Sequence, residues 1–511
     1  MTEISRRSVL KQSAAISVLP LLGSARSLAA PLNPLFTLGV ASGDPLPDSV
    51  MIWTRLAPDP LNGGGMPAQN VPVRWEVAED EGMRRIVQRG EWTARPDTAH
   101  TIRREVGGLE PGRHYWYRFN ALGQESAVGR TRTAPGASEA VERLHLAVAC
   151  CQNYQHGYYT AHRHLAEEDV DLVLFVGDYI YEGGIKKDLP RRHNSAEVTT
   201  LAAYRNRYAQ YKLDPDLQAA HAAFPWAAVP DDHEVDNDYA SDHEETGAVG
   251  RAEFLARRAA AYQAYYEHLP FRPAARPHGA AMRLYRTLRF GSLAAVHLLD
   301  TRQYRTVQPC GKKWQPRCDA ASDPNATLLG SEQEAWLYEK FAAPAAHWTA
   351  LAQQVPIMQR RQPQERGPDL YHGDKWDGYL AARGRLFAEA RRHDVKGFVA
   401  LSGDVHNNWA GSLKADFDDP HSDPIGSEFV ATSIASNGDG EDSKKSQRRI
   451  VEANPHIAFY NGQRGYLRCV VTPETWRTDF RVVPYVSKPG APVTTRASFV
   501  AERESRRLTA G

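Results

Sequence analysis

The chain has 511 residues, of which 42% are hydrophobic and 24% charged, a balance typical of a globular protein long enough for two domains. Its formal net charge is only +1, which argues against nucleic acid as a dedicated partner, because such partners select strongly basic surfaces. Beyond the first 30 residues, no apolar segment is long enough to span a membrane.

Residues 1–30 have the pattern of a targeting segment. Residues 5–11 (SRRSVLK) contain paired arginines, residues 14–23 are mostly apolar, and residues 27–30 (SLAA) end in small side chains. This pattern predicts a twin-arginine signal peptide, and therefore a periplasmic or secreted protein that uses the twin-arginine export machinery. The alternative is a soluble N-terminal helix with a chance Arg-Arg pair.

Residues 31–135 are rich in β-branched and aromatic residues between glycines and prolines, and no helical periodicity interrupts them. The strands expected there are 49–56, 71–78, 86–93 and 114–120. Residues 109–119 resemble the turn and following strand of a fibronectin-type sandwich. We therefore expect a small all-β sandwich domain over residues 31–135.

Residues 133–139 have linker composition, and strands alternate with helical segments after them. This predicts an α/β catalytic domain over residues 143–490. Its expected strands are 144–151, 171–177, 293–300, 349–357 and 396–402, and its expected helices are 158–169, 201–218, 251–269, 331–341 and 380–393. Segments 428–434 and 466–483 are expected to close a second sheet. Residues 491–511 are expected to form a C-terminal tail, either covering the site mouth or extending into solvent.

Five cysteines leave at least one thiol unpaired. Cys310 and Cys318 bracket a short loop and are best placed to form a disulfide, although sequence leaves open whether they are linked. Cys469 lies in an apolar run and is expected to pack in the core. Cys150 and Cys151 follow a strand whose side chains alternate between faces, so only one of them should reach the loop at its end.

Four hydrophobic runs end in residues that bind metals. These residues are Cys151, then Asp178 and Tyr181, then Asp232 to Asn237, and finally Asp404 and His406. In a sheet flanked by helices, ligands and catalytic groups collect beyond the carboxyl ends of the strands. The pattern therefore predicts a metal-dependent enzyme.

The donor types distinguish two cation sites. A thiolate from Cys151 and a phenolate from Tyr181, with Asp178 and His406, favour a strongly Lewis-acidic ion such as Fe(3+). Asp178 can bridge to a second ion, for which Asn237 and Asp404 supply only oxygen, as Ca(2+) prefers. The simpler alternatives are a packing role for Tyr181, a turn role for Asn237 and a solvated acidic loop over residues 232–238.

The motifs together resemble the PhoD-type alkaline phosphatases. The segments that carry the resemblance are 151–153 (CQN), 177–182 (GDYIYE), 231–237 (DDHEVDN) and 402–406 (SGDVH), with 39–45 and 53–56 nearer the N-terminus. The resemblance implies a metallophosphoesterase-like αββα sandwich, similar to purple acid phosphatases, after a small all-β domain. It also implies one iron and calcium, with Cys151, Asp178, Tyr181 and His406 on iron and Asp178, Asn237 and Asp404 on calcium. The doubled Cys150-Cys151 and Val9 in the export motif depart from the family pattern.

The implied activity is hydrolysis of phosphate monoesters and diesters by a hydroxide formed from metal-bound water. We expect His233 to stabilise the transition state or protonate the leaving group, with Asp232 as a ligand or as the partner that orients His233.

Two other functions remain open. One is a phospholipase D-type phosphodiesterase on the same two-metal site, and the other is a non-catalytic phosphate-binding module. The expected substrates are phosphate esters, either small molecules or phospholipid or teichoic-type polymers. We expect the basic pair Lys312-Lys313 to lie in a solvated loop, and Arg302 and Arg305 to lie on the surface.

Overall fold

The computed structural model describes residues 34–343 and 346–511. The predicted export signal therefore lies outside the described residues. Within the described part, no helix combines the length and the apolar character that a bilayer crossing requires.

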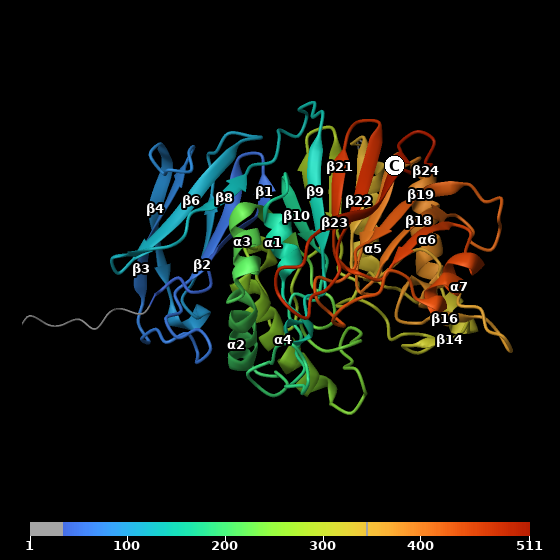
Figure 1. Ribbon diagram of the computed structural model, residues 1–511, viewed down its shortest axis with the longest axis horizontal. Helices are drawn as coiled ribbons and strands as arrows, with labels where there is room; N and C mark the ends of the chain where they lie inside the picture. The colour runs from blue at the N-terminus through green and yellow to red at the C-terminus, as the bar shows by residue number, and fades with distance from the viewer. Residues whose placement is uncertain (1–33, 344–345) are drawn as a thin grey trace, which may run out of the picture. The chain divides into compact units, whose positions relative to one another are not determined.

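Two large β-sheets form the centre of the described protein (Figure 1). The ten-stranded sheet consists, in spatial order, of β24 (Leu508–Ala510), β23 (Thr494–Glu502), β22 (Thr475–Val483), β21 (Arg464–Val471), β9 (Leu144–Ala149), β10 (Leu172–Phe175), β11 (Pro225–Ala228), β1 (Val40–Leu46), β2 (Ser49–Arg55) and β5 (Thr101–Val106). The seven-stranded sheet consists of β12 (Arg286–Phe290), β13 (Ala294–Leu298), β15 (Trp348–Ala352), β17 (Phe398–Ser402), β19 (Pro424–Val430), β18 (Asn408–Lys414) and β20 (Ile457–Asn461). The central strands of each sheet run parallel to one another.

Helices cover the outer face of each sheet. Those packed on the ten-stranded sheet are α1 (Thr160–Ala166), α2 (Leu201–Lys212), α3 (Pro215–Ala223) and α4 (Arg251–His268), and those on the seven-stranded sheet are α5 (Gly330–Ala342) and α6 (Leu380–Arg392). A seventh helix, α7 (Lys445–Ala453), buries one side chain, Ile450. The expected helix over 201–218 is two helices, because Asp214 caps a new helix that starts at Pro215.

Successive side chains of each strand point to opposite faces of the sheet, and so contribute to different layers of the core. On β9, Ala147 and Ala149 face the helices, whereas Leu146 and Val148 face the other sheet. The core between the sheets also includes Val296 from the seven-stranded sheet. This confirms the αββα sandwich that the family resemblance implies.

The N-terminal region is all-β, but its strands divide between two sheets. A five-stranded sheet holds β3 (Val71–Ala78), β4 (Ile86–Ala94), β6 (His114–Ala121), β7 (Gln124–Glu125) and β8 (Gly129–Arg132). The other three strands extend the ten-stranded sheet through pairing of β1 with β11. Gly43 permits this close approach, since a Cβ there would lie 2.4 Å from the carbonyl oxygen of Trp226. The domain boundaries at 135 and 143 stay predictions.

The C-terminal segment differs from its prediction as a tail. Residues 494–502 pair along β22, and residues 508–510 pair with β23. Phe499 and Ala501 are buried against the inter-sheet core, which holds the last strands in place.

Candidate metal centre

The strand-end residues of both sheets meet at one place. Cys151 follows β9, Asp178 follows β10, and Asp232 follows β11, while Asp404 follows β17 of the other sheet. The backbones of neighbouring strand ends are joined, as in the hydrogen bond from the Cys151 amide to the Gly177 carbonyl oxygen at 3.0 Å. Parallel strands therefore bring together side chains that are distant in sequence.

Four of the six residues predicted to bind metals have left-handed backbone conformations. The φ angles are 57° at Cys151, 58° at Asp178, 67° at Asp404 and 56° at His406. Non-glycine residues adopt this region infrequently, and strain of this kind concentrates at functional sites. The conformations turn these side chains out of the strand direction and towards one another.

The predicted iron ligands converge. One ligand atom each from Cys151, Asp178 and His406 lies within 4.8 Å of the others. The Tyr181 hydroxyl lies 2.8 Å from Asp178 Oδ2 and 3.2 Å from His406 Nε2. A thiol, a carboxylate, a phenol and an imidazole thus surround one small volume, and this donor set fits a single cation.

The two adjacent cysteines have separate environments. Cys150 Sγ points to the backbone of the neighbouring sheet, 3.4 Å from the Thr432 carbonyl oxygen. Cys151 Sγ instead joins the group with Asp178 and His406. The geometry therefore agrees with assigning the thiolate to Cys151.

Oxygen donors lie beside this group. Ligand atoms of Asp231, Asp232 and Asp404 lie within 4.8 Å of one another, as do those of Asp178, Asp232 and His233. Asn237 lines the same pocket, where its side-chain amide donates to Glu245. Asp232, predicted as catalytic or as a ligand, thus belongs to both oxygen-rich groups, and Asp231 is a neighbour that the sequence did not single out.

Burial and neighbouring negative charge oppose ionisation of the donor groups. Burial raises the pKa of the Cys151 thiol, and Cys150, Asp178 and Asp404 raise it further. Burial and the nearby Asp178 likewise raise the pKa of the Tyr181 phenol. Since a bound cation reverses this penalty, the donor set favours a multivalent positive charge.

His233 is oriented by a residue other than the predicted one. Its Nδ1 lies 2.7 Å from Glu182 Oε2, and its ring lies 4.1 Å from the Tyr181 ring, centroid to centroid. Asp232 Oδ1 instead accepts a hydrogen bond from the backbone amide of His233, at 3.0 Å. The orienting role predicted for Asp232 therefore belongs to Glu182, which also accepts the backbone amide of Asn237.

The carboxylates around His233 favour its protonated form. Burial lowers the pKa of His233, but Glu182, Asp178 and Asp232 outweigh burial and raise the pKa well above its ordinary value. Because Glu182 engages Nδ1, Nε2 is the ring atom left to act on a substrate. The residue can therefore donate a proton from a fixed position.

Two buried cationic side chains, Arg302 and Lys375, form ion pairs with the carboxylates next to the candidate metal centre. Arg302 is fully buried and pairs with Asp231 and with Asp374, the latter at 3.0 Å. Lys375 Nζ lies 2.9 Å from Asp374 and 2.5 Å from Asp404. The expectation that Arg302 lies on the surface is wrong, as is that for Arg305, which is 1% exposed. The four carboxylates around Arg302 make its burial tolerable.

One loop holds the predicted iron ligands from the other side. The Ser436 hydroxyl donates to the Tyr181 oxygen at 2.7 Å. Asn437, at φ 69°, places its side-chain amide 2.9 Å from His406 Nδ1. Outer groups of this kind fix the ring of a metal-binding histidine.

A pocket of about 450 Å³ is lined by six residues of the candidate metal centre, which are Asp178, Asp232, His233, Asn237, Asp404 and His406. Its wall includes Lys312 and Lys313 from the loop closed by the disulfide Cys310–Cys318. This loop is pinned by pairing of β14 (Trp314–Pro316) with β16 (Leu370–His372). The basic pair thus borders the candidate metal centre, and Lys313 is exposed there, as expected for a solvated loop.

The chain is similar in sequence and in structure to known proteins. Residues 146–480 match the family described as PhoD-like phosphatase, and residues 23–135 match the PhoD-like phosphatase N-terminal domain. The chain is 50% identical over 478 residues to alkaline phosphatase D of Bacillus subtilis (strain 168), covering 93% of this chain and 82% of that protein. A solved structure titled "Structure of PhoD" superposes with a TM-score of 0.92 at 49% identity, covering 94% of this chain and 93% of that one.

Proposed function

Since the chain belongs to the PhoD-like phosphatase family, we propose that its strand-end pocket is the active site of a metal-dependent phosphoric ester hydrolase. The hydrolase class itself follows from the family and from the 50% identity to an alkaline phosphatase. The observation that carries the assignment of the pocket is the convergence of Cys151, Asp178, Tyr181 and His406 on one volume.

In this proposal Cys151, Asp178, Tyr181 and His406 hold Fe(3+), while Asp178, Asn237 and Asp404 hold Ca(2+). The sulfur and phenol donors support iron, and the neighbouring set of oxygens supports calcium. Asp232 lies close enough to both Asp178 and Asp404 to serve as an additional ligand. When bound, such cations neutralise phosphate oxygens and activate water for in-line attack.

The chain's own residues orient the substrate and move the proton. Glu182 fixes His233, whose charge favours the phosphate ester and whose Nε2 is free to protonate the departing alkoxide. Arg302 and Lys375 hold Asp404 in place. Together these contacts keep the reacting groups in one geometry before substrate arrives.

A combined metal and activity measurement tests the proposal. Purified protein is expected to contain iron and calcium, to absorb visible light through thiolate or phenolate charge transfer, and to hydrolyse an aryl phosphate monoester and the corresponding diester. Turnover of phosphatidylcholine alone would instead favour the phospholipase D alternative. Tight phosphate retention without turnover would favour a binding module. No contact among residues 34–343 and 346–511 specifically favours either alternative.

We also propose export to the periplasm or the medium by the twin-arginine route. The motif in residues 5–11 supports it, and so does the disulfide Cys310–Cys318, because disulfides persist in oxidising compartments. Replacing Arg6 and Arg7 by lysine is expected to keep the protein in the cytoplasm. Cell fractionation checks this, and an unchanged exported fraction would exclude the route.

A further inference from the structure

Arg360 is a buried guanidinium that no carboxylate of the described residues contacts directly, although the charges of Asp377, Asp404 and Glu428 act on it. The residue is 4% exposed and lines the same pocket as the candidate metal ligands. Its backbone amide donates to Asp377, but its side chain makes no hydrogen bond or ion pair with any residue in the described ranges. A buried charge normally pairs, so an arginine left unpaired at a pocket wall needs a ligand to complete it.

Aromatic rings hold Arg360 in this position. The guanidinium carbon lies 5.7 Å from the ring centroid of Trp314 and 5.7 Å from that of Trp409. These distances are within cation–π range, so the two indoles stabilise the charge without satisfying its N–H donors. The donors therefore remain available to an oxygen anion.

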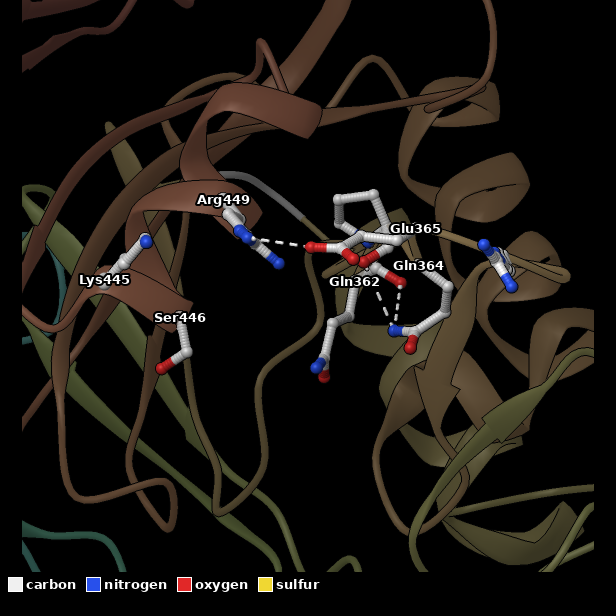
Figure 2. A pocket seen from close by; sticks show the side chains of 8 residues that line it. Gln362, Gln364, Glu365, Lys445, Ser446 and Arg449 are labelled. Atoms are coloured by element: carbon white, nitrogen blue, oxygen red, sulfur yellow. Dashed lines mark hydrogen bonds and ion pairs between the residues drawn. The ribbon is translucent and has the colours of Figure 1, made fainter.

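The neighbouring pocket provides a contrast. Figure 2 shows Arg449 of α7 beside Glu365, and the two form an ion pair at 3.2 Å. That pocket has its own counter-ion, whereas the Arg360 wall does not. An arginine in a pocket is thus not sufficient evidence for a ligand. Arg366 in that pocket also forms no ion pair with the described residues, but it is exposed to water, so burial together with the missing partner distinguishes Arg360.

The charge of Asp404, a proposed metal ligand, acts on Arg360, but the two side chains form no ion pair. Arg360 makes no ion pair within 4.0 Å with Asp232 or Asp404, which instead pair with Arg302. Lys313 lies exposed on the same wall, and the described residues offer its ammonium no carboxylate. A pocket of about 450 Å³ has room for a phosphate group and a substituent attached to it.

We propose that Arg360, with Lys313 and the face of Trp314, forms a subsite for a second anionic group carried by the ester's leaving group. This inference rests on the proposed function, because it assigns the scissile phosphate to the metal centre. The preferred substrates are then phosphate esters whose alcohol bears its own phosphate or carboxylate. The disulfide Cys310–Cys318 holds two of the three residues at the wall.

A pair of matched substrates tests the subsite. The probes are 4-carboxyphenyl phosphate and 4-carbamoylphenyl phosphate, which have nearly the same shape but differ in one negative charge. Wild-type enzyme is expected to show the higher kcat/KM with the carboxylate. Arg360→Gln is expected to lower that preference about tenfold, mainly through KM, while kcat with the uncharged probe stays close to wild type. Arg360→Lys should restore part of the preference, and Arg449→Gln should leave it unchanged.

Two results would overturn the subsite. Wild-type enzyme that does not distinguish the probes lacks it, and an Arg360→Gln variant that slows both probes equally places Arg360 on the scissile phosphate or in the fold. Equilibrium binding of both compounds, monitored by tryptophan fluorescence, measures the contribution of the subsite independently of turnover. If neither probe is hydrolysed but the carboxylate probe still binds more tightly than the uncharged one, the proposed function is rejected and the subsite is kept.

Discussion

Asp178→Asn is expected to remove iron and calcium together and to lower kcat with an aryl phosphate by about 10³-fold or more. Asp178 belongs to two of the three groups of candidate ligands, and its carboxylate also accepts the Tyr181 hydroxyl. Two ionised oxygens are needed to bridge two cations, and an amide supplies only one acceptor oxygen. Elemental analysis by mass spectrometry and steady-state kinetics measure the two effects.

The same substitution is expected to leave the fold intact. Asparagine tolerates the left-handed conformation that Asp178 adopts at φ 58°. Burial raises the pKa of Asp178, and Asp232, Glu234 and Asp404 raise it further, so the ionised form costs stability when no cation is bound. Metal-stripped Asp178→Asn protein should therefore melt at a temperature no lower than metal-stripped wild type.

A carboxylate in the same pocket provides the control. Asp238 lines the pocket but belongs to none of the candidate ligand groups. Asp238→Asn is expected to keep both metals and at least half of the activity. If Asp178→Asn protein retained wild-type iron, Asp178 would not be a ligand of that ion.

The strand-end residues were predictable because their signal is local. A hydrophobic run followed at once by Cys151, Asp178 or Asp404 specifies both the strand and the end at which chemistry collects. The left-handed conformations at these positions are not visible in sequence, but they follow from the same requirement to turn a side chain out of the strand.

The supporting residues were harder to predict, because their roles depend on contacts between distant segments. Glu182 lies in the motif with Asp178 and Tyr181, yet only the fold shows that it meets His233. Arg302 lies two residues beyond an expected strand, but arginine is usually exposed, and its four carboxylate neighbours come from three other segments.

No local pattern marks Arg360 either, since its neighbours Trp314 and Trp409 lie 46 and 49 positions away along the chain. The sheet membership of β1, β2 and β5 was not predictable for a similar reason. The alternation of apolar and polar residues along a strand indicates which of its faces is buried, but not which sheet the strand joins. The short pairing of β1 with β11 decides this, and it depends on a glycine at the contact.

His233→Ala is expected to lower kcat by about 10²- to 10⁴-fold while leaving iron and calcium nearly intact. The imidazole of His233 lies beside Asp178 and Asp232, where a phosphate ester would bind. No other histidine is paired with a buried carboxylate among the described residues that line this pocket. The loss should be smaller for esters with good leaving groups, because these need little protonation. Comparing a nitrophenyl phosphate with an alkyl phosphate separates a proton donor from a residue that only binds phosphate.

Two further variants distinguish catalysis from metal binding. Glu182→Gln keeps the ring of His233 but removes the charge that orients it and raises its pKa, so it should reproduce part of the loss and the same dependence on leaving group. His406→Ala should instead lose iron and its visible absorption, since His406 lies with Cys151 and Asp178. Loss of metal from His233→Ala protein would contradict the acid role and make His233 a ligand, because the same geometry places its ring within reach of Asp178 and Asp232.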